Sequence, residues 1–219
     1  MLIFQLNYLY SLKNSPSFCA VNNKYKSRLH QLKRQLKPGE VYRRTELANW
    51  SKSVDRHLDE LMQEGTLQKL SQGLYYYPKE SAFGKTPPDE NMVVQSFLKD
   101  HRFLLTSPNA YNSLGVGTTQ LYNVRTVYNH KSHGEFKLGN RTFQFYIKPH
   151  FPLKVTPEFL LVDLVNNLEA LAEDKSEVLK KMAEKVPAMD RKKLSKSVVE
   201  YGNVKTKKIF APLLQPHTL

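Results

Sequence analysis

The side chains best suited to chemistry stand near residue 52. Lys52, Ser53, Arg56 and His57 open an amphipathic stretch. Lysine, serine and the start of a helix hold phosphate oxygens, and arginine also reads guanine edges in the major groove. We therefore predict that this segment touches nucleic acid, with Arg56 as the main base reader.

Other candidate sites lack the further residues that their chemistry would require. His130 and His133 stand three residues apart, but no third metal ligand of matching context is evident. The run 115–117 lacks the remaining glycine of a dinucleotide fingerprint. Cys19 is a lone cysteine, which excludes an internal disulfide. We predict no metal, no cofactor, no catalytic residue and no enzymatic activity.

A helix from Lys52 to Glu64 must position the basic segment. Apolar side chains recur there at helical spacing, and Arg56 falls almost opposite to them. They are Val54, Leu58, Leu61 and Met62. Gly65 follows where a C-terminal cap belongs. The spacing therefore predicts a helix whose wet side carries Lys52, Ser53 and Arg56.

Neighbouring segments predict a small domain around that helix. An apolar stripe indicates a helix from Lys24 to Leu36, and a second runs from about Arg44 to Trp50 with Trp50 turned inward. After Gly65, strand-like residues on both sides of the turn Gln72-Gly73 predict a β-hairpin. Three helices and a hairpin are the order of a winged helix-turn-helix. Our predicted DNA-binding set is Lys52, Ser53, Arg56, His57, Gln72, Gly73, Arg43 and Arg44.

Charge and composition divide the chain of 219 residues. Its net charge is +13, and the excess lies in residues 24–86 and 174–219, each with a balance of +6. A basic chain favours a polyanionic partner. Small and polar residues before Pro87-Pro88 indicate a linker. We predict an extension over 1–23, a winged helix-turn-helix over 24–86 and a second domain over 87–219. Without an apolar run of about 18 residues we expect no membrane span and a cytoplasmic location.

The second domain is predicted to mix strands and helices. Helices are expected at Glu90 to Asp100, Pro108 to Leu114, Thr156 to Ala172, Lys175 to Val186 and Asp190 to Tyr201, and strands at Phe103 to Leu105, Asn123 to Tyr128, Gly134 to Leu138 and Arg141 to Lys148. A basic tail follows Tyr201. The fold class is therefore α+β: an N-terminal winged helix-turn-helix, then a mixed α/β domain with C-terminal helices.

Two motifs carry a family resemblance. One is the hairpin from Gly65 to Pro78, and the other is the run Thr106-Ser107-Pro108-Asn109-Ala110-Tyr111-Asn112-Ser113-Leu114-Gly115. Together with the winged-helix order, they make the chain resemble the AbiEi-like antitoxins over about residues 24–200. These are the regulators of abortive-infection type IV toxin-antitoxin pairs. The extension and the basic tail depart from the family pattern.

The resemblance implies a function. A member of that family binds the promoter DNA of its own operon through its first domain. Its second domain, the antitoxin domain, counters a nucleotidyltransferase-type toxin without necessarily touching it. The residues alone leave an alternative open: a winged-helix adaptor that binds protein or RNA and regulates no promoter.

Overall fold

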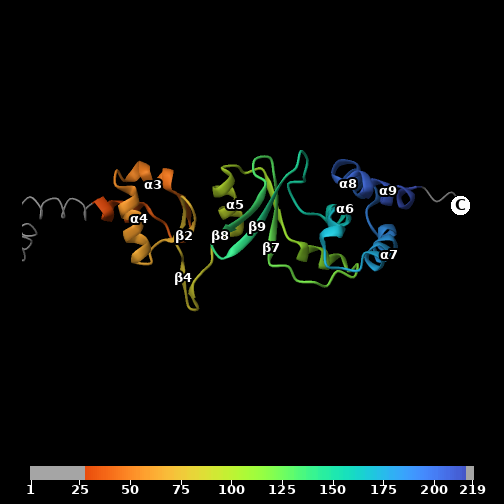
Figure 1. Ribbon diagram of the computed structural model, residues 1–219, viewed down its shortest axis with the longest axis horizontal. Helices are drawn as coiled ribbons and strands as arrows, with labels where there is room; N and C mark the ends of the chain where they lie inside the picture. The colour runs from red at the N-terminus through yellow and green to blue at the C-terminus, as the bar shows by residue number, and fades with distance from the viewer. Residues whose placement is uncertain (1–27, 216–219) are drawn as a thin grey trace, which may run out of the picture. The chain divides into compact units, whose positions relative to one another are not determined.

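The protein is described by a computed structural model over residues 28–215 (Figure 1). It is a mixed α+β protein with several helices at its C-terminal end. The chain splits into two compact units, Met1–Phe97 and Leu98–Leu219. The predicted extension over 1–23 and the start of the first predicted helix lie outside the described residues.

The first unit combines helices with a three-stranded antiparallel sheet. Residues 28–35 are helical, followed by β1 (Val41–Arg43), α3 (Arg44–Trp50), α4 (Val54–Gln63), β2 (Gln68–Ser71) and β3 (Leu74–Tyr76). The strands lie in the order β1-β3-β2, with Val41 and Gln68 on opposite sides of Tyr76. β1 is absent from the sequence prediction because three residues are too short to show strand alternation.

Leucines from each helix form the core of this unit. Leu32, Leu47, Leu58 and Leu61 are almost completely buried, as the helical spacing predicts. The prediction that Trp50 turns inward is wrong. Its side chain remains 43% exposed and packs edge-on against Tyr42, with ring centroids 6.1 Å apart.

The predicted linker before Pro87-Pro88 is also corrected. It contains a second hairpin, formed by β4 (Glu80–Ser81) and β5 (Gly84–Lys85). The unit then continues through most of α5 (Glu90–Leu98), so the division falls at Phe97, later than the predicted boundary. An Arg43 Nη2 donates to the Phe97 carbonyl oxygen at 2.9 Å, which ties the end of α5 to the first unit.

The second unit begins with a four-stranded sheet in the order β6-β7-β9-β8. Its strands are β6 (Phe103–Thr106), β7 (Val124–Asn129), β8 (Gly134–Leu138) and β9 (Arg141–Ile147). Only the central pair, β7 and β9, is parallel. The predicted helix at Pro108–Leu114 is a 3-10 helix, η1.

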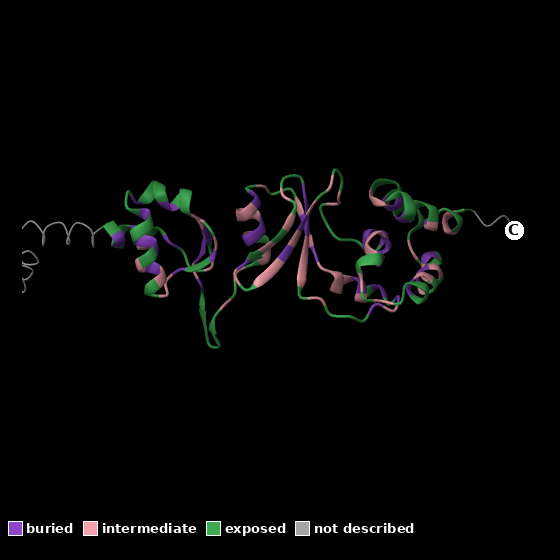
Figure 2. Cartoon of the chain, viewed as in Figure 1, coloured by how far each residue is buried: buried purple, intermediate pink, exposed green. Residues whose placement is uncertain are grey.

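Helices complete the second unit. They are α6 (Pro157–Asn167), α7 (Lys175–Lys185), α8 (Arg191–Tyr201) and α9 (Val204–Phe210), with short 3-10 turns η2 (Leu168–Ala170), η3 (Val186–Ala188) and η4 (Pro212–Leu214). Side-chain caps begin all four α-helices, for example Thr156 accepting from the Phe159 amide. α6 is mostly buried at the centre of their core, as Figure 2 shows.

Part of the predicted basic tail is therefore structured. The sequence does not predict α9, because only Thr206 and Phe210 of its seven residues are buried and Ile209 is half-buried, too few for a periodic pattern. Along residues 28–215, no helix is both long enough and apolar enough to cross a membrane.

Candidate nucleic-acid interface

The beginning of α4 presents three of the predicted contact residues to solvent. Lys52, Ser53 and Arg56 are all exposed. Ser53 occupies the N-cap position, but its side chain caps no amide. Its own amide donates to the Ser51 hydroxyl at 3.2 Å. The turn before the helix thus fixes the backbone at the start of α4.

His57 is a correction to the predicted set. Its side chain is completely buried, and its Nδ1 is hydrogen-bonded to the Ser51 Oγ at 2.7 Å. Burial lowers the pKa of the imidazole. Successive positions of a helix differ by about 100°, so His57 lies on the inner side of α4 although the preceding Arg56 is exposed. His57 therefore supports the fold and cannot reach a base edge.

Arg44 connects α4 with the first hairpin. Its Nε and Nη2 donate to the two carboxylate oxygens of Asp55 at 2.6 and 2.5 Å. This pairing raises the pKa of Arg44 and lowers that of Asp55. The Arg44 amide donates to the Gly73 carbonyl at 2.9 Å. One residue thus joins the start of α3, the first turn of α4 and the turn between β2 and β3.

The turn between β2 and β3 presents mostly backbone atoms at its surface. Gln72 is exposed, whereas Gly73 adopts a φ of +72°, which other residues adopt only with strain. A side chain at position 73 would also contact the Cβ of Arg44 at 3.9 Å. The turn is compact and held against α3.

Arg43 is a second correction. Its guanidinium is half-buried and donates to the Phe97 carbonyl oxygen, and burial lowers its pKa. Its amide donates to Glu46 Oε2 at 2.8 Å at the start of α3. Arg43 therefore has a structural role at the end of α5. Of the predicted set, the structure brings Arg44, Gln72 and Gly73 together with the exposed start of α4.

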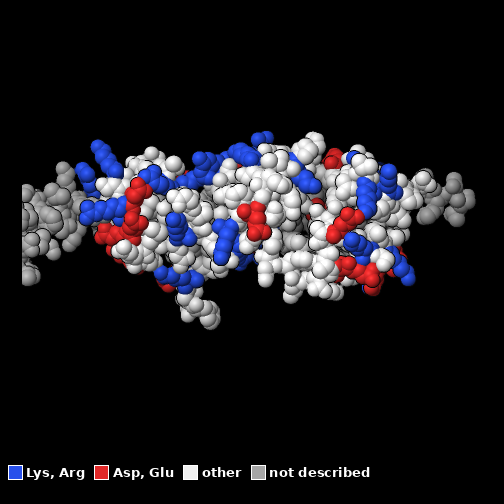
Figure 3. Space-filling model, in the orientation of Figure 1, with Lys and Arg blue, Asp and Glu red and all other residues white. Residues whose placement is uncertain are grey.

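Carboxylates moderate the charge of this surface. α4 and its C-cap carry Asp55, Asp59, Glu60 and Glu64, and Figure 3 shows acidic atoms gathered over this helix. Asp55 pairs with Arg44, and Glu64 pairs with Lys33, each at 2.5 Å. The sequence indicated neither pair, because 11 and 31 residues separate the partners and no local spacing rule applies. The surface is mixed in charge rather than a basic stripe.

The second unit contains a buried polar cluster that resembles a reaction centre in composition. Asp163 on α6 is 2% exposed and accepts from the hydroxyls of Tyr111 and Tyr128, each at 2.7 Å. Asn167 Nδ2 donates to Asp163 Oδ1 at 3.1 Å. Burial raises the pKa of Asp163, against the lowering effect of its donors. Because the carboxylate is enclosed and hydrogen-bonded, we assign it a structural role.

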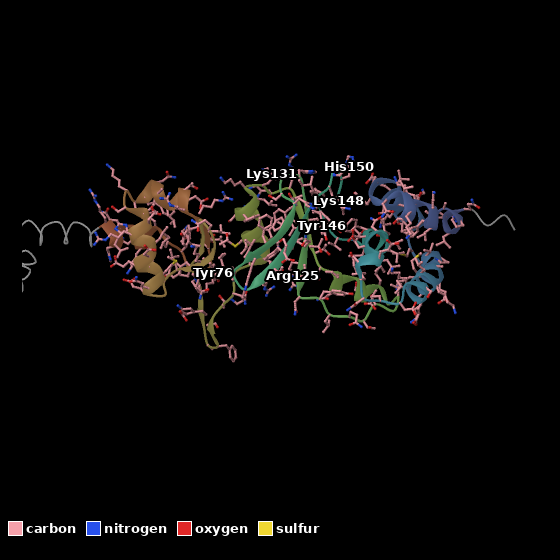
Figure 4. The ribbon with its side chains drawn as sticks, in the orientation of Figure 1. Tyr76, Arg125, Lys131, Tyr146, Lys148 and His150 are labelled. Carbon is pink, nitrogen blue, oxygen red and sulfur yellow. The ribbon has the colours of Figure 1, made fainter. Side chains whose placement is uncertain are left out.

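Aromatic side chains and a lysine surround that cluster. Lys148 Nζ lies 5.3 Å from the centroid of the Tyr128 ring, and Figure 4 labels Lys148 beside Tyr146 and His150. His130 and His133, at which no metal site is predicted, lie in separate aromatic contacts: His130 stacks on Phe151 at 4.8 Å, and His133 meets Tyr146 edge-on at 5.9 Å. Within residues 28–215, no three His, Cys, Asp or Glu side chains are grouped to hold a metal.

Comparisons with known proteins show which solved structure and which family this chain is similar to. The RV2827C protein from Mycobacterium tuberculosis, known from a crystal structure, is similar with a TM-score of 0.53 and 14% identity. The match covers 86% of this chain and 74% of that chain, and at this identity it shows similarity of fold alone. A comparison with the curated proteins found no match. A family model matches residues 30–198, across both units. The chain therefore belongs to DUF6088, a family of unknown function.

Proposed function

We propose that the first unit is a winged helix-turn-helix that binds duplex DNA. The order of its elements, helix 28–35, β1, α3, α4, β2 and β3, is that of a winged helix, and the sheet order β1-β3-β2 fits the same topology. In such a domain the second helix of the helix-turn-helix pair lies in the major groove. That helix is α4, and the turn Gln72-Gly73 is the tip of a short wing.

One observation carries this proposal. Arg44 binds Asp55 on α4 through its side chain and Gly73 on the wing through its amide. These links hold the first turn of α4 and the wing tip in one fixed surface. Exposed Lys52, Ser53 and Arg56 lie at the same end of α4. A recognition helix uses its N-terminal residues on bases while neighbouring groups hold the backbone.

The charges of α4 define how it would bind. The +6 balance of residues 24–86 includes seven carboxylates, and four of them lie on α4 and its C-cap, so this surface itself neutralises few phosphates. Affinity would then depend on a few directed contacts, above all those of Arg56. We expect a moderate decrease of affinity with salt and a marked dependence on sequence.

A role for the whole chain follows from its resemblance to the AbiEi-like antitoxins. In this proposal the first unit represses the promoter of its own operon, and the second unit counters a nucleotidyltransferase-type toxin in the cytoplasm. The second unit has its own hydrophobic core, which supports a separate activity. Expression of the full chain with the neighbouring toxin from an unrelated promoter tests neutralisation apart from repression.

The alternative is an adaptor that binds protein or RNA. The carboxylates over α4 favour this second function, because an acidic helix surface is better suited to a basic protein than to DNA. The two proposals differ in what Arg56 should do. An adaptor would show no preference for the DNA upstream of its own gene.

A mobility-shift titration with that upstream DNA distinguishes the two. We expect Arg56→Ala to weaken binding by about 1 to 3 kcal/mol, the usual worth of a bidentate base contact, and to leave binding to random DNA almost unchanged. Arg102→Ala is the matched control, because it removes an equally positive and exposed side chain from the second unit. Equal affinity of the native chain for upstream and random DNA would reject the regulator and favour the adaptor.

A further inference from the structure

The second hairpin is an ordered projection of the first unit. Its strands pair Glu80 with Lys85 and Ser81 with Gly84. The Ser81 hydroxyl donates to the Gly84 carbonyl at 2.6 Å, which closes the tip. At the base, the Thr86 amide donates to the Lys79 carbonyl at 2.9 Å. Figure 1 shows β4 running away from the three-stranded sheet. The hairpin is therefore a defined element.

The base of the hairpin is fastened to the body of the unit. The Tyr76 hydroxyl donates to the Thr86 carbonyl at 3.0 Å, and Figure 4 labels Tyr76 where the hairpin leaves β3. Lys85 Nζ donates to the Gly65 carbonyl just after α4 at 2.6 Å. These bonds fix the direction in which the tip points.

The tip carries a large apolar side chain in full contact with water. Phe83 is 101% exposed, the highest value among the large exposed hydrophobic residues of the described chain. A phenylalanine gains about 1.5 to 3 kcal/mol when it leaves water, so a fixed projection that ends in one is typical of a docking contact.

A cavity of about 550 Å³ opens at the base of the same hairpin. Pro38, Thr66, Tyr77 and Pro78 line it together with charged residues of both signs. Phe83 stands four residues beyond Lys79, which is about 13 Å of extended chain, and so cannot fold back into the cavity of its own chain while the hairpin is formed.

We infer that a second copy of this chain docks here, with Phe83 of each copy in the cavity of the other. Phe83 lies at the tip of the hairpin, and the cavity lies at its base. Two copies related by a two-fold axis can therefore each place Phe83 in the cavity of the other. Two hairpins side by side and head to tail would place each tip at the other base.

Free strand edges support the same occupant. β4 and β5 pair only with each other within the described residues. Edges of this kind are available for pairing with another strand. The contact is small, because each phenylalanine contributes about 200 Å² at most. A weak, concentration-dependent dimer is expected, and its formation does not depend on the proposed DNA binding.

Sedimentation of the full chain over a concentration series tests the inference. We expect a monomer–dimer equilibrium whose dissociation constant rises at least tenfold in Phe83→Ala. Leu121→Ala is the control, because Leu121 is an equally apolar side chain, 83% exposed, in the second unit. It should leave the equilibrium unchanged. Phe83→Ala removes no buried contact, so its thermal unfolding should match that of the native chain.

A second variant tests the cavity independently. Thr66→Trp should fill it and weaken the dimer to a similar degree. A mixture of Phe83→Ala and Thr66→Trp chains should associate more strongly than either alone, because one projection and one open cavity then meet. A native chain that stays monomeric, or a dimer that Phe83→Ala does not weaken, overturns the inference. So does a loss of DNA affinity in Phe83→Ala with unchanged association, which would assign the tip to nucleic acid.

Discussion

In the first unit, ion pairs such as Arg44 with Asp55 and Lys33 with Glu64 lie at the surface, whereas the second unit encloses Asp163 in its core. Exposed pairs contribute little to stability, typically below about 1 kcal/mol. A buried carboxylate with three hydrogen-bonding side chains constrains the arrangement of η1, β7 and α6 around it. These two ion pairs of the first unit are exposed to solvent, whereas the buried carboxylate of the second unit defines how its elements pack.

The strongest test of this contrast is Asp163→Ala. The hydroxyls of Tyr111 and Tyr128 and the amide of Asn167 would lose a common acceptor inside the core. We expect a loss of about 3 to 5 kcal/mol, because each buried polar group left without a hydrogen-bond partner costs about 1 to 3 kcal/mol. Hydrogen exchange in urea should show the loss in the second unit only. A change below about 1 kcal/mol would mean that the cluster does not hold the unit together.

The matching test for the first unit is Leu58→Ala. Leu58 is 1% exposed among the leucines of that core, so its truncation should cost about 2 to 5 kcal/mol. Chemical denaturation followed by the fluorescence of Trp50 reports this unit, because the chain contains one tryptophan. Val199→Ala, at a 66% exposed position of α8, serves as the control. An unchanged fluorescence transition in Leu58→Ala would contradict the assigned core.

The third test is the response to acid. Burial lowers the pKa of His57 in the folded protein, so the unfolded chain takes up the proton first. Stability from the neutral imidazole is complete above the unfolded pKa of about 6.5 and declines as the pH falls below it, by at most about 1.4 kcal/mol per pH unit. Unfolding at pH 7.5 and pH 5 should show this decline in the native chain. His57→Gln should reduce it, and an equal decline in both would exclude His57 as its source.

Asp163 acts in the opposite direction. Its folded pKa is raised, so the folded protein binds this proton more tightly than the unfolded chain does. Its contribution to the stability of the second unit therefore increases as the pH falls towards the unfolded pKa. Lowering the pH should therefore destabilise the first unit through His57, whereas protonation of Asp163 should stabilise the second unit.

The regular helices could be predicted from the sequence, because their apolar stripes correspond to the residues of the core. α4, α6, α7 and α8 lie within one or a few residues of the predicted helices. Short elements were not accessible. β1 has three residues, and the β4–β5 hairpin has two residues per strand in a segment of small and polar side chains that reads as a linker.

The candidate site was predictable only in part. Helical phase predicts that Arg56 is exposed, and the structure agrees. His57, also a predicted contact, is buried, because the next position of a helix turns by about 100°. Arg43, a predicted DNA contact, instead donates to the Phe97 carbonyl oxygen, a contact that spans 54 residues of the sequence. Such partners follow from the fold and not from local spacing.

The smallest expected effect on stability comes from Asp55→Asn, which removes the carboxylate charge that binds Arg44. Both side chains are exposed, so the free energy of unfolding should fall by less than about 1 kcal/mol. DNA affinity should also fall, because the Arg44–Asp55 link no longer fixes the first turn of α4 relative to the start of α3. Glu135→Gln, an exposed carboxylate on β8, is the control and should change neither quantity. If Asp55→Asn left DNA binding unchanged or strengthened it, the pair would not be needed to hold the DNA-binding surface, and only the second unit would use a charged side chain to define its structure.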